Sequence, residues 1–247
     1  MVKHINIKTL SKNGINSAIE TFINDTEIHI IINNYVNITF VCIANNLDCL
    51  VYGCLRDINR DDIEIVSMEN NNIFVKTKLS KDEVLDVIKQ KEIVGTCESI
   101  EISDSKLESN KIVIPFNNTR YKLKNDILLN ICNDFYTNLD DKRMYYSRII
   151  SLESLAYMDC NDTNIKTNIY KILGMSDNTN LLESIILLDC ILNTEILQIL
   201  IRAKITFIIA KQIENFAVLR LAQKFGLTIG YFNKDEVRIL SHNSRII

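Results

Sequence analysis

Three short runs of mostly apolar residues near the end of the chain constrain its fold more than any other feature. They lie at 184–189, 205–209 and 227–232, and each is typical of a strand that is buried on both faces. Between them, segments 195–203 and 213–225 carry apolar residues at helical spacing. Because such strands must be covered on both sides, the pattern predicts a mixed, mostly parallel sheet between two helical layers, closed at its edge by a hairpin.

Capping residues indicate where the helices of this half begin and end. A helix is expected over 163–173, with Gly174 as the first residue beyond it. Thr194 is expected to cap the helix 195–203, and Gly226 to end the helix that follows. Other expected elements of this half are a helix within 123–139 and an extended segment from 144.

The first half of the chain predicts a smaller α+β unit. Two asparagines separate the alternating segments 27–32 and 36–41, and asparagine tolerates the positive φ of a tight hairpin turn. Ser80 and Glu83 have the spacing of a capping box, which should open a helix over 81–90. The other expected elements are strands at 2–7, 63–66, 73–75 and 112–114, and a helix within 45–55.

The domain boundary is expected where the one proline of the chain interrupts the pattern. Pro115 ends the strand before it, and residues 115–120 have the polar composition of a linker. We therefore expect an N-terminal α+β domain over 1–118 and an α/β domain over 119–247.

Composition excludes several classes of protein. A hydrophobic content of 47% over 247 residues excludes a disordered chain. A net charge of −3 argues against a protein that binds nucleic acid through a strong basic field. No apolar run approaches the ~18–20 residues of a membrane helix, and the polar N-terminus is unlike a signal peptide. Seven cysteines without a CxxC pair fit a reducing compartment, so we expect a cytoplasmic protein.

Common catalytic motifs do not occur in the sequence. It contains no GxGxxG, no P-loop and no GxSxG. His4, His29 and His242 are far apart and lack metal-ligand spacing. The HxE motif of zinc deaminases is missing too, because Asn6, Ile31 and Ser244 stand where the glutamate would follow each histidine. Their PCxxC motif is missing because Phe116 follows the only proline. We therefore expect no bound metal.

Three stretches of the sequence resemble one known family. EIHIIINN (27–34) followed by CLVYGCLRDIN (49–59) is similar to that family's strand-turn-strand and its "eelalGfllsEGii" helix, with Gly53 on the family glycine. VGTCESI (94–100) is similar to its "tsCGxCG" loop, with Cys97 on the first cysteine. The segment from Thr194 to Phe232 is similar to its "SSEm…lAeelgltLvGF" ending. The chain thus resembles the FdhD/NarQ family, accessory proteins of formate dehydrogenase, over about 20–245.

The resemblance implies a fold and an activity. Family members carry sulfur as a persulfide from a cysteine desulfurase to the molybdopterin guanine dinucleotide cofactor of a molybdenum or tungsten enzyme such as formate dehydrogenase. Their C-terminal domain is a cytidine-deaminase-like three-layer α/β/α domain without zinc. They bind the guanine-nucleotide part of the cofactor and form homodimers. The same properties are expected here, with Cys97 as the catalytic residue.

The chain departs from the family at most of its ligand loops. Ile100 replaces the second loop cysteine, and segment 147–155 lacks the glycines and histidine of "TGGxHaAaL". In the "EDVGRHNAlDKviG" stretch, the family's Arg-His pair is lost. The matching positions in that stretch are Asp162, Lys171 and Gly174. The scaffold pattern is therefore better preserved than the chemistry of the loops.

These departures leave three functional hypotheses. A sulfur carrier needs an exposed thiol of lowered pKa; Cys97 lies in a loop-like stretch, although Glu98 beside it would raise the thiol pKa. The alternatives are a chaperone that binds the cofactor or a guanine nucleotide without transferring sulfur, and a structural paralogue without a ligand. Any ligand site should lie at the C-terminal ends of the parallel strands, near loops 190–194 and 210–214.

Overall fold

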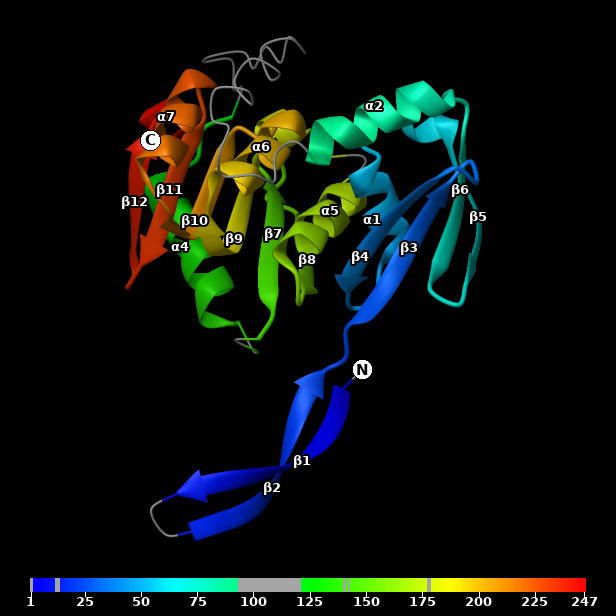
Figure 1. Ribbon diagram of the computed structural model, residues 1–247. Coiled ribbons are helices and arrows are strands. Elements are labelled where there is room, and N and C mark those ends of the chain that lie inside the picture. Colours follow the sequence, from blue (N-terminus) through cyan, green and yellow to red (C-terminus); the bar gives the residue numbers. More distant parts are fainter. Residues whose placement is uncertain (1, 12–13, 93–120, 140, 142, 177–178) are drawn as a thin grey trace.

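A computed structural model describes residues 2–11, 14–92, 121–139, 141, 143–176 and 179–247 of the chain. They form a six-stranded sheet, a four-stranded sheet and a separate two-stranded hairpin (Figure 1). The expected strand 112–114, the linker 115–120 and Cys97 lie outside the described residues. No helix in the described ranges is long and apolar enough to cross a membrane.

The six-stranded sheet has the strand order β12-β11-β10-β9-β7-β8. Its strands are β7 (Tyr145–Ser151), β8 (Tyr157–Asp162), β9 (Ser184–Leu192), β10 (Phe207–Ile213), β11 (Thr228–Asn233) and β12 (Glu236–Ser241). The central strands β9, β10 and β11 are parallel, as the apolar runs predicted. β7 pairs antiparallel with both β8 and β9, and β12 closes the other edge antiparallel to β11. Two of the five strand pairings are parallel and three are antiparallel, so the sheet is mixed as predicted but not mostly parallel.

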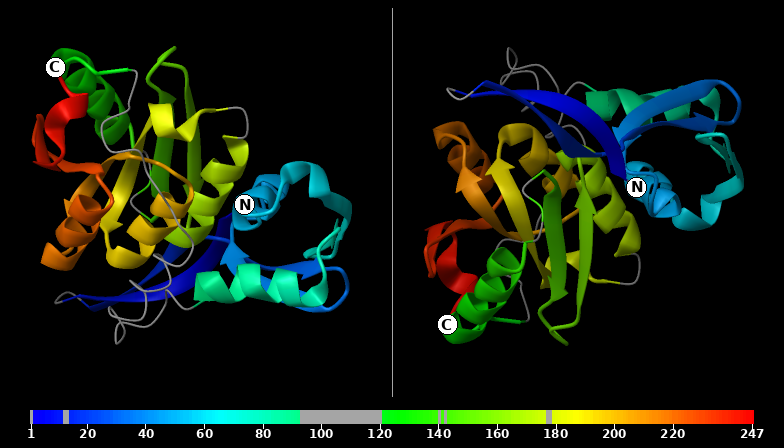
Figure 2. Two further views of the ribbon diagram at one scale, coloured as in Figure 1. Left: turned by 90° about the horizontal axis from the view of Figure 1, so that it is seen from above. Right: turned by 90° about the horizontal axis from the view of Figure 1, so that it is seen from below.

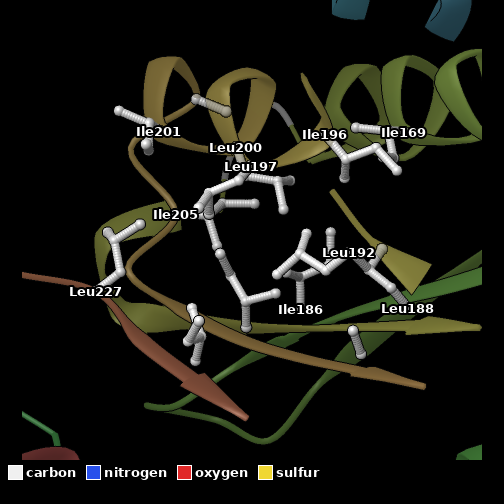
Figure 3. Close-up of a cluster of buried hydrophobic side chains, with 14 of the residues drawn as sticks. Ile169, Ile186, Leu188, Leu192, Ile196, Leu197, Leu200, Ile201, Ile205 and Leu227 are labelled. Atoms are coloured by element: carbon white, nitrogen blue, oxygen red, sulfur yellow. The ribbon is translucent and has the colours of Figure 1, made fainter. Parts of the chain in front are cut away.

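Helices cover both faces of this sheet. The helices of this half are α4 (Asn125–Thr137), α5 (Ile165–Met175), α6 (Thr194–Arg202) and α7 (Phe216–Lys224). Ile186 and Leu188 of β9 point into a core formed with α5, α6 and α7 (Figure 3). Ile185 and Leu187 point to the opposite face, into a core formed with α4. Because successive side chains alternate across a strand, the continuous apolar run of β9 serves two cores, which is the predicted three-layer arrangement.

The N-terminal unit contains a four-stranded sheet and two helices. Its sheet order is β4-β3-β6-β5, with β3 (Thr26–Ile32), β4 (Val36–Cys42), β5 (Ile63–Glu69) and β6 (Asn72–Thr77). Its helices are α1 (Leu47–Cys54) and α2 (Lys81–Glu92). Asn33 and Asn34 have φ of 50° and 63°, so the predicted hairpin turn is confirmed. The capping box is confirmed too, since the Ser80 amide donates to the Glu83 carboxylate at 2.8 Å.

Three predicted helix starts are wrong by one to three residues, and the first is α5, which begins at Ile165 and not at 163 because Asn164 is its cap. The cap of α6 is Asn193, whose side-chain oxygen accepts the Ile196 amide at 2.9 Å, and Thr194 is already helical. α7 begins at Phe216 and not at 213, because β10 continues past a bulge and pairs with β9 as far as Ile213. The predicted end at Gly226 is confirmed by its φ of 65°.

The role predicted for Gly174 is also wrong, because this glycine lies inside α5, which continues to Met175. A Cβ on Gly174 would lie 1.9 Å from the Cys49 carbonyl oxygen of α1. A Cβ on Gly53 of α1 would lie 1.7 Å from the Tyr170 carbonyl oxygen of α5. Both glycines therefore let the backbones of α1 and α5 touch, between the two sheets (Figure 2).

A hairpin precedes the N-terminal unit and stands away from it (Figure 1). Its strands are β1 (Val2–Ser11) and β2 (Gly14–Ile23), which pair antiparallel along their whole length. The sequence predicted a strand at 2–7 and did not predict β2.

Candidate functional site

Three helices begin at the end of the six-stranded sheet where β8, β9 and β10 finish, and we call this end the open edge. β8, β9 and β10 run in the same direction, so α5, α6 and α7 all start at the carboxyl ends of these strands. Each helix is capped by an asparagine whose side-chain oxygen accepts amides of the first turn: Asn164, Asn193 and Asn215. The edge therefore presents three positive helix ends side by side, an arrangement suited to an anionic group.

Two ion pairs cross this edge. The Lys166 ammonium at the start of α5 pairs with the Glu195 carboxylate at the start of α6. The Lys211 ammonium of β10 lies 2.8 Å from the carboxylate of Asp189 in β9. Asp189 is buried, whereas Lys211 is 63% exposed. Lys166 and Lys211 are thus cations close to the helix starts, and each already has a carboxylate partner.

A groove of about 580 Å³ lies at the ends of β10 and β11 beside the start of α7. Phe216 and Tyr231 supply aromatic side chains, and Lys211 and Asn215 supply polar groups. Phe232 also lines the groove, but its ring stacks on Tyr136 of α4, with ring centroids 4.9 Å apart. Such a lining suits a planar ring that carries an anionic group. The predicted loop 210–214 contributes to this groove, and the predicted loop 190–194 does not.

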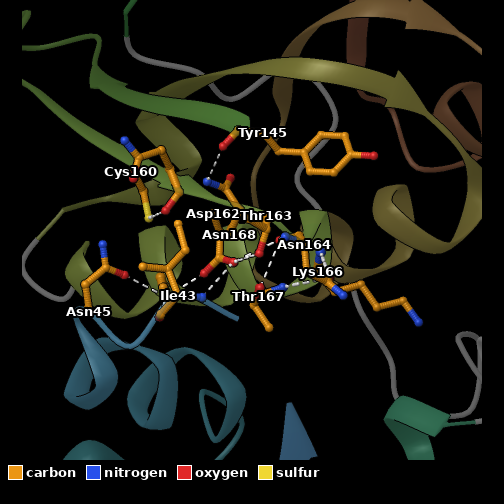
Figure 4. A network of polar contacts seen from close by, with 12 residues as sticks. Ile43, Asn45, Tyr145, Cys160, Asp162, Thr163, Asn164, Lys166, Thr167 and Asn168 are labelled. Atoms are coloured by element: carbon orange, nitrogen blue, oxygen red, sulfur yellow. Dashed lines mark hydrogen bonds and ion pairs between the residues drawn. The ribbon is translucent and has the colours of Figure 1, made fainter. Parts of the chain in front are cut away.

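A buried polar network lies where the two units meet (Figure 4). The Lys171 ammonium and the Asp162 carboxylate are 2.5 Å apart, and both side chains are fully buried. Lys171 also donates to the Ile43 carbonyl at 2.7 Å and to the Asn45 side chain at 2.8 Å. The second oxygen of Asp162 accepts the backbone amides of Ile43 and Asn164. The network ties the connection between β4 and α1 to the connection between β8 and α5.

The positions of this network were matched by the sequence comparison, but their role was not predicted. Asp162 and Lys171 are two of the three matching residues of the 161–174 stretch, and both are inaccessible to a ligand. The family's Arg-His pair falls on Ile165 and Lys166, at the first turn of α5 on the open edge. The matching positions Asp162, Lys171 and Gly174 are buried, and the Arg-His pair at the exposed start of α5 is replaced.

Burial raises the pKa of five cysteine thiols in the described segments. The pKa of Cys42 rises to about 11, and those of Cys132, Cys160 and Cys190 rise to about 12. Burial followed by the Asp48 charge raises the pKa of Cys49 as well. Cys54 is buried like the others, as expected for a core residue. These thiols are therefore poor nucleophiles at neutral pH.

Two cysteines need separate mention. Cys160 lies in β8 and is 5% exposed. Cys97, the predicted catalytic residue, lies outside the described residues.

Two of the histidines pair with hydroxyl groups, and the His242 Nε2 atom lies 3.3 Å from the Gln223 carbonyl oxygen. His4 lies 2.9 Å from the Thr21 hydroxyl across the hairpin, and His29 lies 3.0 Å from the Thr39 hydroxyl across β3 and β4. Within the described ranges, no group of three His, Cys, Asp or Glu side chains could hold a metal ion.

Comparison with known proteins gives a likeness in fold. No protein-family model matches the chain, and no curated protein matches it by sequence. A solved structure from Desulfotalea psychrophila, described as a "putative formate dehydrogenase accessory protein", superposes with a TM-score of 0.73 at 14% identity. The match covers 100% of this chain and 99% of that one. The resemblance drawn from the sequence motifs is thus confirmed at the level of the fold, which this chain shares with that structure.

Proposed function

We propose that this protein is an accessory protein in the maturation of a molybdenum or tungsten enzyme such as formate dehydrogenase. The observation that carries the proposal is the full-length likeness in fold to the Desulfotalea psychrophila protein, which includes both units of the chain. The strand order β12-β11-β10-β9-β7-β8, with helices on both faces, supports a cytidine-deaminase-like C-terminal domain. The two separate sheets on either side of 93–120 support domains near 1–118 and 119–247.

Within this role, the protein carries sulfur on Cys97. The Cys97 thiolate attacks the terminal sulfur of a cysteine desulfurase persulfide, the S–S bond of the donor breaks, and the donor leaves as a thiolate. Cys97 then holds the persulfide and presents it to the molybdopterin guanine dinucleotide cofactor. The support is the position of Cys97 on the first cysteine of the family's loop, and burial disfavours the thiolate at Cys42, Cys132, Cys160 and Cys190.

The test is to incubate the protein with a cysteine desulfurase and cysteine and to measure its mass. Sulfur transfer adds one sulfur atom, about 32 Da, on the peptide that contains Cys97. Cys97→Ser should abolish the adduct. Cys49→Ser is the matched control, because Cys49 is the half-buried thiol of the described segments and its substitution should leave the adduct unchanged. An adduct on other cysteines, or none, would contradict sulfur transfer.

The groove beside α7 favours a second candidate, a chaperone that binds the guanine-nucleotide part of the cofactor without transferring sulfur. Aromatic side chains and Lys211 line this groove, whereas the Arg-His pair at the start of α5 is replaced. Calorimetric titration with a guanine nucleotide should then give a Kd below ~1 mM, weakened in Phe216→Ala and Lys211→Ala. Val66→Ala, on an exposed site of β5 outside the groove, is the control.

The two measurements together separate the candidates. Persulfide on Cys97 supports the carrier, and nucleotide binding without persulfide supports the chaperone. Failure of both leaves the structural paralogue. The partners of the proposed function are a cysteine desulfurase, the client enzyme and a second copy of the chain, all in the cytoplasm.

A further inference from the structure

A small cleft lies where the end of α1 meets the carboxyl-terminal halves of α5 and α6. Its volume of about 30 Å³ has room for about two water molecules or one small ionic group. A second cavity of about 260 Å³ shares part of its wall with the cleft and adds Arg60. We call the smaller cavity the arginine cleft; its wall includes Arg56, Asp57, Tyr170, Leu173, Ile199 and Arg202.

Two polar side chains of the arginine cleft have no hydrogen-bond partner among the described residues. The Arg202 guanidinium makes no hydrogen bond or ion pair within those segments, although the side chain is partly buried. The Tyr170 hydroxyl makes no hydrogen bond there either, while its ring packs edge-on against Phe40. Because polar groups removed from water are nearly always paired, two such donors in one cavity point to an acceptor that the chain itself does not supply.

The donors of the cleft are charged or protonated at neutral pH. Burial lowers the pKa of Arg202, so its charge is poorly solvated where it stands. Burial raises the pKa of Tyr170, so the phenol keeps its proton and can donate it to an acceptor. Among the residues that line the two cavities, Asp57 is the one acid, and three guanidinium groups against it leave a net charge of +2.

The other two arginines of the two cavities are held in place by the end of α5. The Arg56 guanidinium donates to the Leu173 carbonyl at 2.7 Å, and the Arg60 guanidinium donates to the Gly174 carbonyl at 3.4 Å. Arg60 also lies over the Tyr52 ring, 3.9 Å from its centroid. The carbonyls at the end of a helix carry partial negative charge, which would repel an anion. These contacts neutralise that charge and fix two cations at the wall.

We propose that the arginine cleft binds an oxyanion, the phosphate or carboxylate group of a small ligand, through Arg202, the Tyr170 hydroxyl and Arg56. The planar guanidinium group matches the oxygens of both kinds of group. The cleft has room for the anionic group, and the adjoining cavity has room for an organic part. The competing interpretation is that Arg202 only complements the carboxyl end of α6, as cations at this position commonly do.

This site is separate from the groove proposed for a guanine nucleotide. α5 and α6 begin at the open edge, and the arginine cleft lies near their other ends. At a rise of about 1.5 Å per residue, one helix length of roughly 15 Å separates the two places. No residue lines both the arginine cleft and the groove.

The test is a titration of the full chain with inorganic phosphate at constant ionic strength, followed by the width of the phosphorus NMR line. We expect saturable binding with a Kd below about 5 mM. Arg202→Met should raise the Kd at least about tenfold, and Tyr170→Phe, which keeps the ring, at least about threefold. Lys204→Met is the matched control, because Lys204 is exposed just beyond α6 and does not line the cleft. It removes the same charge and should leave the Kd within about twofold.

Two further probes identify the source of the anionic group. Glycerol phosphate that binds at least about tenfold more tightly than inorganic phosphate supports a phosphate ester whose organic part enters the larger cavity. Displacement of phosphate by acetate supports a carboxylate ligand. Equal binding of the two phosphates, without competition by acetate, supports free phosphate.

The proposal is overturned if phosphate does not bind at about 20 mM, or if it binds Arg202→Met as well as the unchanged chain. Equal weakening by Arg202→Met and Lys204→Met also overturns it, because the ion is then attracted only by the charge of the surface. If Arg202→Met does not fold, Arg202→Lys, which keeps the charge and loses the planar fork, decides together with Tyr170→Phe. The measurement uses neither desulfurase nor guanine nucleotide, so its failure is distinguishable from a failure of the proposed function.

Discussion

Replacing Lys171 with methionine should destabilise the protein by about 3 kcal/mol. The substitution keeps most of the side-chain volume and removes the ammonium, which leaves the Asp162 carboxylate buried without a cation. Breaking a buried pair by removing one partner typically costs about 3–5 kcal/mol. The lower end applies here because Asp162 keeps backbone donors from Ile43 and Asn164. Against a total of about 5–15 kcal/mol, this is a large fraction of the free energy of unfolding.

The measurement is urea unfolding followed by circular dichroism and tyrosine fluorescence, since the chain contains no tryptophan. In thermal unfolding of a chain of this length, a loss of about 3 kcal/mol corresponds to a fall of roughly 6–12 °C in the midpoint temperature. Lys166→Met is the control on the same helix. Lys166 is 45% exposed in its pair with Glu195, and exposed pairs contribute under about 1 kcal/mol.

A double variant tests whether the cost arises from the unpaired charge. Lys171→Met together with Asp162→Leu removes both charges, so its cost should fall below the sum of the two single costs. The reasoning is refuted if Lys171→Met costs no more than Lys166→Met, or if the double variant shows no coupling.

Three further predictions test other parts of the structure. The thiols of raised pKa should make the protein less stable in alkali. Above about pH 9 the unfolded chain loses thiol protons that the folded chain keeps, so the free energy of unfolding falls by about 1.4 kcal/mol per pH unit for each thiol until the folded pKa is reached. Urea titration at about pH 8 to 11 measures this fall. These thiols are Cys42, Cys132, Cys160 and Cys190. Asn193→Ala should cost about 1 kcal/mol and Thr194→Ala less, because Asn193 is the cap of α6; equal costs in thermal unfolding would contradict this assignment. Gly53→Ala should cost more than about 2 kcal/mol by the same method, because its Cβ would overlap the Tyr170 carbonyl of α5 and the two backbones must separate.

The centre of the fold could be predicted from the sequence because its strands are buried on both faces. A continuous apolar run such as 184–189 suits a strand covered on both faces, as in a parallel sheet, so the parallel pairing of β9 with β10 could be predicted from it. The second strand of the N-terminal hairpin, β2, could not be predicted. In 14–23 the apolar residues recur at 15, 18, 19, 22 and 23, which is the spacing of an amphipathic helix. The segment is a strand because it pairs with β1, and periodicity along one segment does not report its partner.

The candidate site was predictable in position and not in detail. The direction of β10 and the start of α7 placed a ligand site near 210–214, where the groove lies. Tyr231 and Phe232 line the groove from the next strand, and a local pattern does not bring them there. The role of Lys171 depends on the Ile43 carbonyl, which is 128 residues earlier in the chain. Contacts of this kind follow from the packing of α1 against α5 and carry no signal in either segment alone.

Positions that match the family's motif and positions that depart from it differ in how much stability a substitution costs. Asp162, Lys171 and Gly174 lie where α5 meets the N-terminal unit, and a change there leaves a buried charge or a backbone overlap. Substitutions at the open edge of the sheet cost little stability, and they change what the edge can bind. The edge now holds Lys166 and Lys211, each paired with a carboxylate, so an anionic ligand must compete with an acid already present. The nucleotide binding proposed for this site would therefore rest largely on the aromatic side chains of the groove and on the helix amides, and less on the two paired lysines.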